Sequence, residues 1–311
     1  MAHLNTVLGT LHPEEMGITA VHEHILFGPP GWEADPGAWF KMGKVFEKCY
    51  NDLMDFKLQG GATFIDASGI GSGRELDVHI KLASATGLHV VASTGFLGEL
   101  FTAPHFHARD ADYFETLFVH ELTVGMGRTR VKAGVINAGG GAQPMTRLEA
   151  AQHRGAARAA RKTGAAVMTH AINALDEQLA IFREEKLDPA RIILGGCDTR
   201  LDLERDKRVA KAGCYVAYDH VGLESWSRMA HALPDQRRAE LVKAMLDAEL
   251  GDRLIVSAGS SGWVLGQGED HLSNVGNVLR YFVPRLAAAG VAEADVRRIF
   301  ADNPKRVLPI Q

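Results

Sequence analysis

Two histidines one residue apart, His22 and His24, lie in the stretch Ala20–Leu26. Small and β-branched residues surround them and Gly28-Pro29-Pro30 follows, which predicts a β-strand ending near residue 28. Side chains alternate along a strand, so both imidazoles project from one face, one pleat apart. Two imidazoles at this spacing can chelate one metal ion, although two ordinary strand histidines would have the same spacing.

Polar residues follow later apolar runs in the same way. They are Asp66, Thr169-His170, Gly196-Cys197-Asp198, Asp219-His220 and the segment 257–263. Three histidines, His22, His24 and His170, therefore stand at the ends of two predicted strands. Such a grouping favours a metal site if those strands belong to one barrel.

The elements that must position these side chains alternate regularly. Apolar, β-rich runs span residues 18–26, 62–68, 89–94, 131–138, 165–171, 191–197, 214–221 and 253–258. Helical patterns span residues 38–58, 76–86, 110–123, 146–162, 175–185, 203–212, 235–250, 272–288 and 293–300. Most of the β runs are continuously apolar, which is typical of parallel strands covered on both faces.

Eight strand–helix units without a linker predict an α/β fold, a single (β/α)8 TIM barrel over residues 1–311. In such a barrel the chemistry lies at the C-terminal ends of the strands. An open doubly wound sheet is the alternative fold. No glycine-rich phosphate loop follows the first strand, which argues against it.

Composition narrows the class of protein. The 311 residues are 46% hydrophobic, enough for a sizeable core, and carry a net charge of -4 without a basic block. Nucleic acid is therefore not an expected partner. The three scattered cysteines fit a reducing cytoplasm, and neither a signal peptide nor a membrane-spanning run is expected. We predict a soluble, cytoplasmic protein.

Several segments of the chain resemble the phosphotriesterase family of the amidohydrolase superfamily, near its lactonase-like and phosphotriesterase-related branches. They are TAVHEHIL (19–26), VKAGVI (131–136), VMTHA (167–171), RIILGGCD (191–198), YDHVG (218–222), LIVSAGSSGW (254–263) and NPKRVL (303–308). The resemblance implies a (β/α)8 barrel with two divalent metals, commonly zinc, bridged by a carbamylated lysine and a hydroxide. It also implies hydrolysis of a lactone or a phosphotriester by that hydroxide.

By this resemblance the family uses six protein ligands, of which three are retained as His22, His24 and His170. Three family positions are vacated. Asn137 stands where the bridging lysine is expected, Gly196 stands where a histidine is expected, and Ser260 stands where an aspartate is expected. An ambiguity of one residue leaves Gly259 as the alternative to Ser260. We therefore expect no paired-metal centre and at most one weakly bound divalent ion.

Four further residues match family positions around the substrate: His220, Trp263, Phe96 and Leu97. The family's tyrosine is expected about where Leu97 stands, and the loop from Trp263 through His271 matches a loop that caps the leaving-group pocket. His220 fits a substrate-contacting or proton-relaying role as well as a structural one. For Asp198 we expect a solvated loop residue or a partner of Arg200.

Two functions of different classes follow. One is the metal-dependent hydrolase of lactones or organophosphate esters that the family implies, with hydrolysis impaired by the lost ligands. The other is a metal-poor natural or engineered barrel that acts as a ligand-binding or repurposed site. In both, the expected partner is a small molecule, and a homodimer is possible because relatives are often homodimers.

Overall fold

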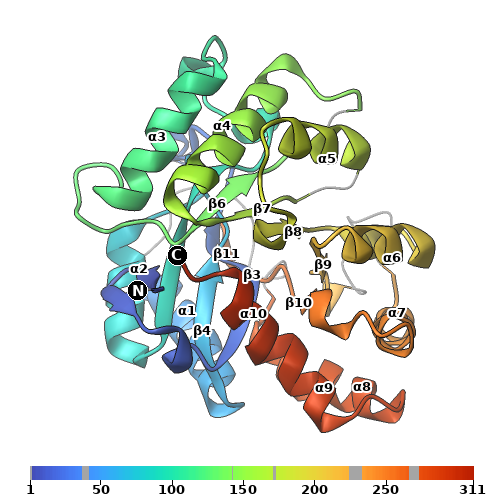
Figure 1. The fold of residues 1–311 in the computed structure, drawn as a ribbon. Coiled ribbons are helices and arrows are strands. Elements are labelled where there is room, and N and C mark those ends of the chain that lie inside the picture. Colours follow the sequence, from blue (N-terminus) through green and yellow to red (C-terminus); the bar gives the residue numbers. More distant parts are fainter. Residues whose placement is uncertain (1, 37–41, 142, 171–172, 224–232, 266–272) are drawn as a thin grey trace.

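The computed structural model describes residues 2–36, 42–141, 143–170, 173–223, 233–265 and 273–311. Its centre is one parallel sheet with the strand order β10-β9-β8-β7-β6-β5-β4-β3-β11, and helices surround it (Figure 1). The strands of this sheet are β3 (Ile18–Phe27), β4 (Gly61–Asp66), β5 (His89–Phe96), β6 (Val135–Ala138), β7 (Ala166–Met168), β8 (Ile192–Leu194), β9 (Tyr215–Tyr218), β10 (Leu254–Val256) and β11 (Ser261–Val264).

The sheet closes through its last two strands. β10 pairs with β9 and β11 pairs with β3, both in parallel, and only residues 257–260 separate β10 from β11. Within this short link, the amide of Gly259 donates to His22 O at 3.0 Å and the amide of His24 donates to Ser260 O at 2.7 Å. β10 and β11 are therefore two halves of one eighth barrel strand, and the predicted (β/α)8 barrel is confirmed.

Most helices agree closely with the predicted ranges. The predicted helix 272–288 instead contains a π-helical stretch (Val278–Phe282) before a short α-helix, and the helix at residues 303–307 was not predicted. The helices are α1 (Met42–Leu58), α2 (Leu76–Thr86), α3 (Ala111–Thr123), α4 (Arg147–Thr163), α5 (Leu175–Glu184), α6 (Leu203–Lys211), α7 (Asp235–Asp247), α8 (Val283–Ala288), α9 (Glu293–Arg297) and α10 (Asn303–Val307). Local sequence fixes several ends. Thr146 and Glu149 form a capping box at the start of α4, and Gly164 ends that helix in the left-handed conformation (φ 79°).

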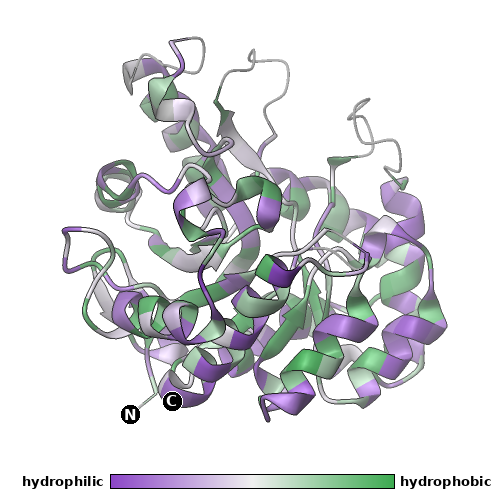
Figure 2. Cartoon of the chain, turned by 90° about the horizontal axis from the view of Figure 1, so that it is seen from above, coloured by the Kyte–Doolittle hydropathy of each residue, from purple (hydrophilic) through white to green (hydrophobic). Residues whose placement is uncertain are grey.

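Two layers of apolar side chains make up the core. The inner layer fills the barrel with alternate strand residues, among them Val21, Val91, Val135 and Ile193. The outer layer lies between the strands and the helices, and Figure 2 shows hydrophobic strands in the interior with hydrophilic outer helix faces. This division tells which residues of each strand face the barrel axis.

The amino-terminal end of the barrel is closed by segments near both chain ends. β1 (Leu4–Thr6) and β2 (Gly9–Leu11) form an antiparallel hairpin that the sequence analysis did not predict. Leu4 and Leu11 of this hairpin join the inner layer together with Val307 and Leu308. His3 and Ile310 form a β-bridge, so the described ends of the chain lie side by side, as Figure 1 shows.

The observed strands are shorter than the predicted runs at several places. β6 begins at Val135 rather than at residue 131, and β7 ends at Met168, two residues before His170. The predicted helices 38–58 and 272–288 both begin at residues that lie outside the described ranges.

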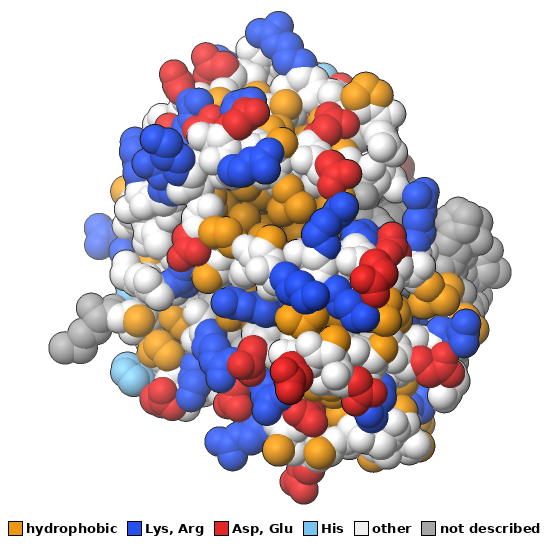
Figure 3. Space-filling view, turned by 45° about the vertical axis from the view of Figure 1, so that its right-hand side comes forward, with side chains coloured by type: hydrophobic (Ala, Val, Ile, Leu, Met, Phe, Trp, Pro, Cys, Tyr) orange, Lys and Arg blue, Asp and Glu red, His pale blue; other side chains and the backbone are white. Residues whose placement is uncertain are grey.

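On the face drawn in Figure 3, basic and acidic side chains are interspersed. A search of the described helices found none with the length and apolarity that a bilayer crossing requires.

Candidate functional site

The three predicted histidines meet at the carboxyl ends of the strands. His22 and His24 belong to β3 and are 6% and 8% exposed, and His170 follows β7. The ring centroids of His22 and His170 lie 4.4 Å apart, and those of His22 and His24 lie 5.4 Å apart. The structure therefore brings together the histidines that the sequence placed on one barrel mouth.

A chain of hydrogen bonds orients His22 and His170. His22 Nδ1 lies 2.6 Å from Asp219 Oδ2, and His22 Nε2 lies 3.0 Å from His170 Nδ1. When His22 donates through Nδ1, its Nε2 accepts from His170 Nδ1, and the lone pair of His170 is then on Nε2. That Nε2 atom is buried without a hydrogen-bond partner. Burial, with the neighbouring His22 charge, holds the pKa of His170 well below its usual value. His170 is thus a neutral base with an open acceptor.

His24 is oriented by a hydroxyl. Ser68 Oγ donates to Leu26 O at 2.8 Å, so it accepts from His24 Nδ1, which lies 3.1 Å away. This leaves the lone pair of His24 on Nε2, the atom available to a ligand or metal ion. Burial and the charge of His22 lower the pKa of His24 to about 3.

A buried ion pair between Asp66 and His79 lies next to Ser68. Asp66 accepts from the amides of Ile25 at 2.7 Å and Ser68 at 2.9 Å, and its Oδ2 lies 3.0 Å from His79 Nε2. Burial opposes ionisation of Asp66, but the charge of His79 outweighs it and the pKa of Asp66 falls to about 2. Asp66 thereby fixes the backbone at Ile25, next to His24, and at Ser68, the hydrogen-bond partner of His24.

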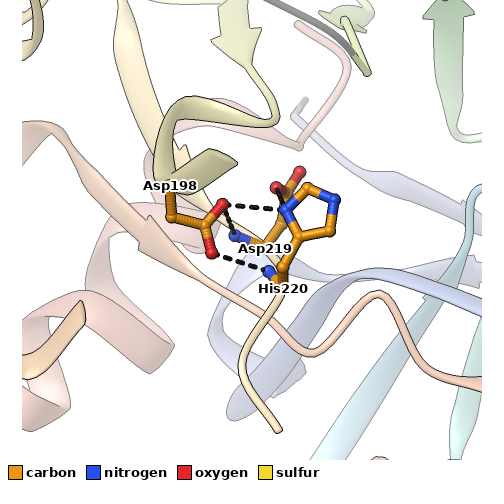
Figure 4. Close-up of side chains that lie close together, drawn as sticks. All are labelled: Asp198, Asp219 and His220. Atoms are coloured by element: carbon orange, nitrogen blue, oxygen red, sulfur yellow. Dashed lines mark hydrogen bonds and ion pairs between the residues drawn. The ribbon is translucent and has the colours of Figure 1, made fainter. Parts of the chain in front are cut away.

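A second cluster, formed by Asp198, Asp219 and His220, adjoins the histidines (Figure 4). His220 Nδ1 lies 2.8 Å from Asp198 Oδ1 and 3.2 Å from Asp219 Oδ1. These two carboxylates outweigh burial and raise the pKa of His220 to about 10, so the ring is an imidazolium at neutral pH. Among the described residues, these three also have ligand atoms within 4.8 Å of one another, close enough to hold a metal ion.

The expectation for Asp198 was wrong. Asp198 is fully buried, and its Oδ2 accepts from Arg238 Nε at 2.6 Å rather than from Arg200. Arg238, 1% exposed, comes from α7 and also donates to Asp235 Oδ1 at 2.9 Å. Sequence reasoning missed this residue because a partner forty positions away leaves no local signal. Asp198, Arg238 and Asp235 therefore form one buried network of charges beside the mouth.

The vacated family positions each have partners of their own. Asn137 Nδ2 donates to Ala67 O at 2.6 Å and to Ser93 Oγ at 2.9 Å, whereas its Oδ1 is buried without a partner. Gly196 has a left-handed backbone (φ 76°), and its amide donates to Asp219 Oδ1 at 2.8 Å.

Ser260 is tied to Glu23, a carboxyl group that sequence reasoning did not single out. Ser260 donates to Glu23 Oε2 through its hydroxyl and through its amide, the latter at 2.7 Å. Burial raises the pKa of Glu23 to about 7 despite these hydrogen bonds. At Gly259 (φ 58°), an added Cβ would lie 2.6 Å from Asp219 O, so a side chain there requires a backbone shift.

The remaining predicted residues lie in different places. The prediction that Phe96 lies at the substrate site was wrong. Its ring packs in the outer layer, with its centroid 5.0 Å from that of Phe106 and 5.7 Å from that of Phe114. The reason is that Gly95 takes the inward position in the alternation of strand side chains. Leu97 and Trp263 are half-buried, and Trp263 pairs with Leu26 in the strand register. His271 lies outside the described residues.

A parallel (β/α)8 barrel with histidines and carboxylates gathered at the carboxyl ends of its strands has the layout of a barrel enzyme. The model of the phosphotriesterase family matches residues 2–308, so the chain belongs to that family. This confirms the resemblance drawn from the sequence motifs.

The relatives found span nearly the whole chain. A phosphotriesterase homology protein of Mycobacterium tuberculosis is 25% identical and covers 100% of this chain and 99% of its own. An aryldialkylphosphatase of Saccharolobus solfataricus is 26% identical over 96% of each chain, and an N-acetyltaurine hydrolase of Bos taurus is 25% identical over 98% of this chain and 97% of its own.

A solved structure is similar over 98% of this chain and 99% of that one, with 26% identity and a TM-score of 0.90. It is described as the engineering of organophosphate hydrolysis activity from a weak promiscuous lactonase template. Members of this family are generally metal-dependent.

Proposed function

We propose that this chain binds a small ester-like or lactone-like molecule in the barrel mouth and does not carry out the paired-metal hydrolysis of its family. One observation carries the proposal: none of the vacated positions offers a metal ion a carboxylate, a carbamate or an imidazole. The amide hydrogens of Asn137 are committed to Ala67 O and Ser93 Oγ, Ser260 is committed to Glu23, and Gly196 has no side chain. A carbamate and a carboxylate would each contribute a negative charge, and neutral groups replace both.

The residues present therefore do not fit a pair of divalent ions. The retained donors, His22, His24 and His170, are imidazoles without charge to offset two dications. Two carboxylates of the adjoining cluster already have partners. Asp198 contacts Arg238 and His220, and Asp219 contacts His22 and His220. A metal pair would have to displace these buried contacts.

A one-metal hydrolase of esters or lactones is the second candidate. It is favoured by the hydrogen bonds from His24 Nδ1 to Ser68 and from His170 Nδ1 to His22 Nε2, which leave Nε2 of His24 and Nε2 of His170 available. Metal-ligating histidines commonly have such partners. A single divalent ion such as zinc, held at these Nε2 atoms, would polarise a carbonyl or phosphoryl oxygen.

Turnover measured with and without a chelator separates the two candidates. The purified protein is assayed on a panel of lactones and aryl phosphotriesters, first as isolated, then with added zinc, then with a chelator. The binding proposal predicts ligand-induced thermal stabilisation and no chelator-sensitive turnover in any arm. Chelator-sensitive turnover at ordinary enzymatic rates contradicts it and supports the one-metal hydrolase.

The proposal also covers the cellular compartment, the partner and the assembly of the protein. Cys49, Cys197 and Cys214 are free and buried thiols, which supports a reducing compartment such as the cytoplasm. We propose a small molecule as the partner rather than nucleic acid or a membrane, and a homodimer as the assembly. Light scattering of the purified protein tests the assembly.

A further inference from the structure

We propose that the amino-terminal end of the barrel, opposite the histidines, holds a second binding site for a small phosphate-bearing anion. The site is a cavity of about 540 Å³ between the starts of β8, β9 and β10. Its basic lining residues are Arg191, Arg253 and Arg306, and Tyr215 lies between them. We refer to this cavity as the basal cavity.

Strand order brings these residues together. Arg191 directly precedes β8, Tyr215 is the first residue of β9, and Arg253 directly precedes β10. β8 pairs with β9 and β9 pairs with β10 in parallel, so the residues that start these strands are neighbours at one edge. Arg306 reaches the same place from α10.

Arg191 is the strongest sign of a ligand. It is 7% exposed, and its Nη1 donates to Val307 O at 3.0 Å and to Pro309 O at 2.8 Å. In the part of the chain that the structure describes, no carboxylate lies within ion-pair distance of it, and its Nε and Nη2 have no hydrogen-bond partner. A guanidinium so deeply buried is stabilised by an anion that takes up its remaining donors. Burial also lowers the pKa of Arg191, and the charge of Asp188 offsets this only in part.

Arg253 supplies a second guanidinium. Its Cζ lies 5.0 Å from the centre of the Tyr215 ring, within the range of a cation–π contact. Across the described ranges no carboxylate pairs with it either. Two guanidinium forks that face one cavity match the several oxygen atoms of a phosphate group, which accepts bidentate hydrogen bonds from arginine.

Some of the carboxylates that line the same cavity already have hydrogen-bond or ion-pair partners, and another is exposed at its rim. Asp188 Oδ1 accepts from the amide of Ala190 at 2.9 Å, and Asp252 is shared by Arg298 and Arg306, each at 3.3 Å. Glu249 is solvent-exposed. These acidic groups disfavour a large polyanion and leave room for a small one that reaches Arg191 and Arg253.

Titration of the intact protein with inorganic phosphate, followed by thermal unfolding and calorimetry at constant ionic strength, tests the proposal. We expect a saturable rise in melting temperature and a dissociation constant at least about tenfold weaker in Arg253→Gln. Arg297→Gln is the matched control, because that arginine is exposed and, among the described residues, makes only one ion pair, at 4.0 Å. A sugar phosphate and acetate, added in separate arms, show whether a phosphate ester binds as well and whether any carboxylate suffices.

The outcomes are distinct. The proposal predicts that phosphate binding persists in His220→Gln, a change at the opposite end of the barrel, and that Arg191→Lys weakens it as Arg253→Gln does. No saturable effect of phosphate on the wild-type protein, or an equal effect in Arg253→Gln, overturns it. An effect of acetate as strong as that of phosphate also overturns the assignment to phosphate.

Discussion

His22 Nδ1 and Asp219 Oδ2 lie 2.6 Å apart, although 197 residues separate them in the chain. The contact joins β3 to the end of β9 across the mouth of the barrel. Asp219 also accepts from the Gly196 amide and lies beside His220, so one carboxylate organises three strand ends. The histidines and the Asp198–Asp219–His220 cluster are therefore one connected site.

Replacing Asp219 by asparagine should destabilise the fold. The change removes a buried negative charge from His22 and His220, and breaking a buried pair costs about 3 kcal/mol of unfolding free energy. Urea unfolding at pH 7 measures the loss. In the control Asp252→Asn, the carboxylate removed is 64% exposed and the expected loss is below about 1 kcal/mol. Equal losses in the two variants would show that Asp219 does not organise the site.

Stability should fall as the pH rises from neutral toward 10, because of His220. Its pKa is raised in the folded state to about 10, from the ordinary histidine value of 6.5. A group with a raised folded pKa contributes stability that is full below its unfolded pKa and is lost as the pH rises through the folded value. The window for His220 is therefore about pH 6.5 to 10. Glu23, with its pKa raised from 4.5 to about 7, lowers stability with rising pH in a separate window, about pH 4.5 to 7.

Urea midpoints measured from pH 7 to pH 10 test this dependence. We expect a clear alkaline decline in the wild-type protein and a shallower one in His220→Gln. The exposed His105 provides the control His105→Gln, which should decline as the wild-type protein does. Parallel curves for His220→Gln and the wild-type protein would mean that His220 is not held protonated.

The Asp66–His79 pair should couple strongly. A double-mutant cycle with Asp66→Asn, His79→Gln and the combined variant should give a coupling free energy of about 2 kcal/mol. The reason is that both side chains are fully buried, so either single change leaves the other group buried without its ion-pair partner. Unfolding by urea gives all four free energies, and additive effects of the two changes would contradict the ion pair.

Placing a carboxylate at Ser260 should destabilise the chain in a pH-dependent way. Ser260→Asp sets a second acid against Glu23, whose pKa is about 7, so repulsion grows as the pH rises through 7. We expect a loss of about 2 kcal/mol at pH 8 and less at pH 6. Ser260→Asn is close in size and neutral, and its loss should not change with pH. A pH-independent loss in Ser260→Asp would contradict the account of Glu23.

Asn137→Lys, Gly196→His and Ser260→Asp together should restore binding of two zinc ions, and each alone should do little, because a bridged pair needs its ligands as a unit. The structure adds a cost at Gly196, whose left-handed φ of 76° disfavours histidine by about 1–3 kcal/mol. The triple variant should therefore be less stable without zinc than the wild-type protein and should gain more from zinc and bicarbonate. If its melting temperature does not respond to zinc, the three positions are not what excludes the metals.

The barrel and the meeting of His22, His24 and His170 were predictable because both depend on periodicity and strand order. Apolar runs identify parallel strands, and residues that follow those strands share one end of the barrel. The partners of these residues were not predictable. Arg238 reaches Asp198 from a helix forty positions away, and nothing in the local sequence distinguishes that ion pair from a contact with Arg200.

Parity explains the error at Phe96. Its place just after the predicted strand 89–94 suggested the mouth, but one residue decides which face a strand side chain occupies. Val91, in the inner layer, and Gly95 share the inward face of β5, so Phe96 points to the helices. Asn137, which the family resemblance placed at the mouth, lies on the inward face of β6 with Val135.

Metal content is the most direct test of the central claim that this barrel does not assemble the paired-metal centre of its family. The wild-type protein is purified without chelator, equilibrated with excess zinc and bicarbonate, freed of unbound metal and measured by elemental analysis. We predict at most one zinc per chain. Two zinc ions per chain, retained through gel filtration, would contradict the claim and would mean that Asp198, Asp219 or both leave their ion pairs to bind metal.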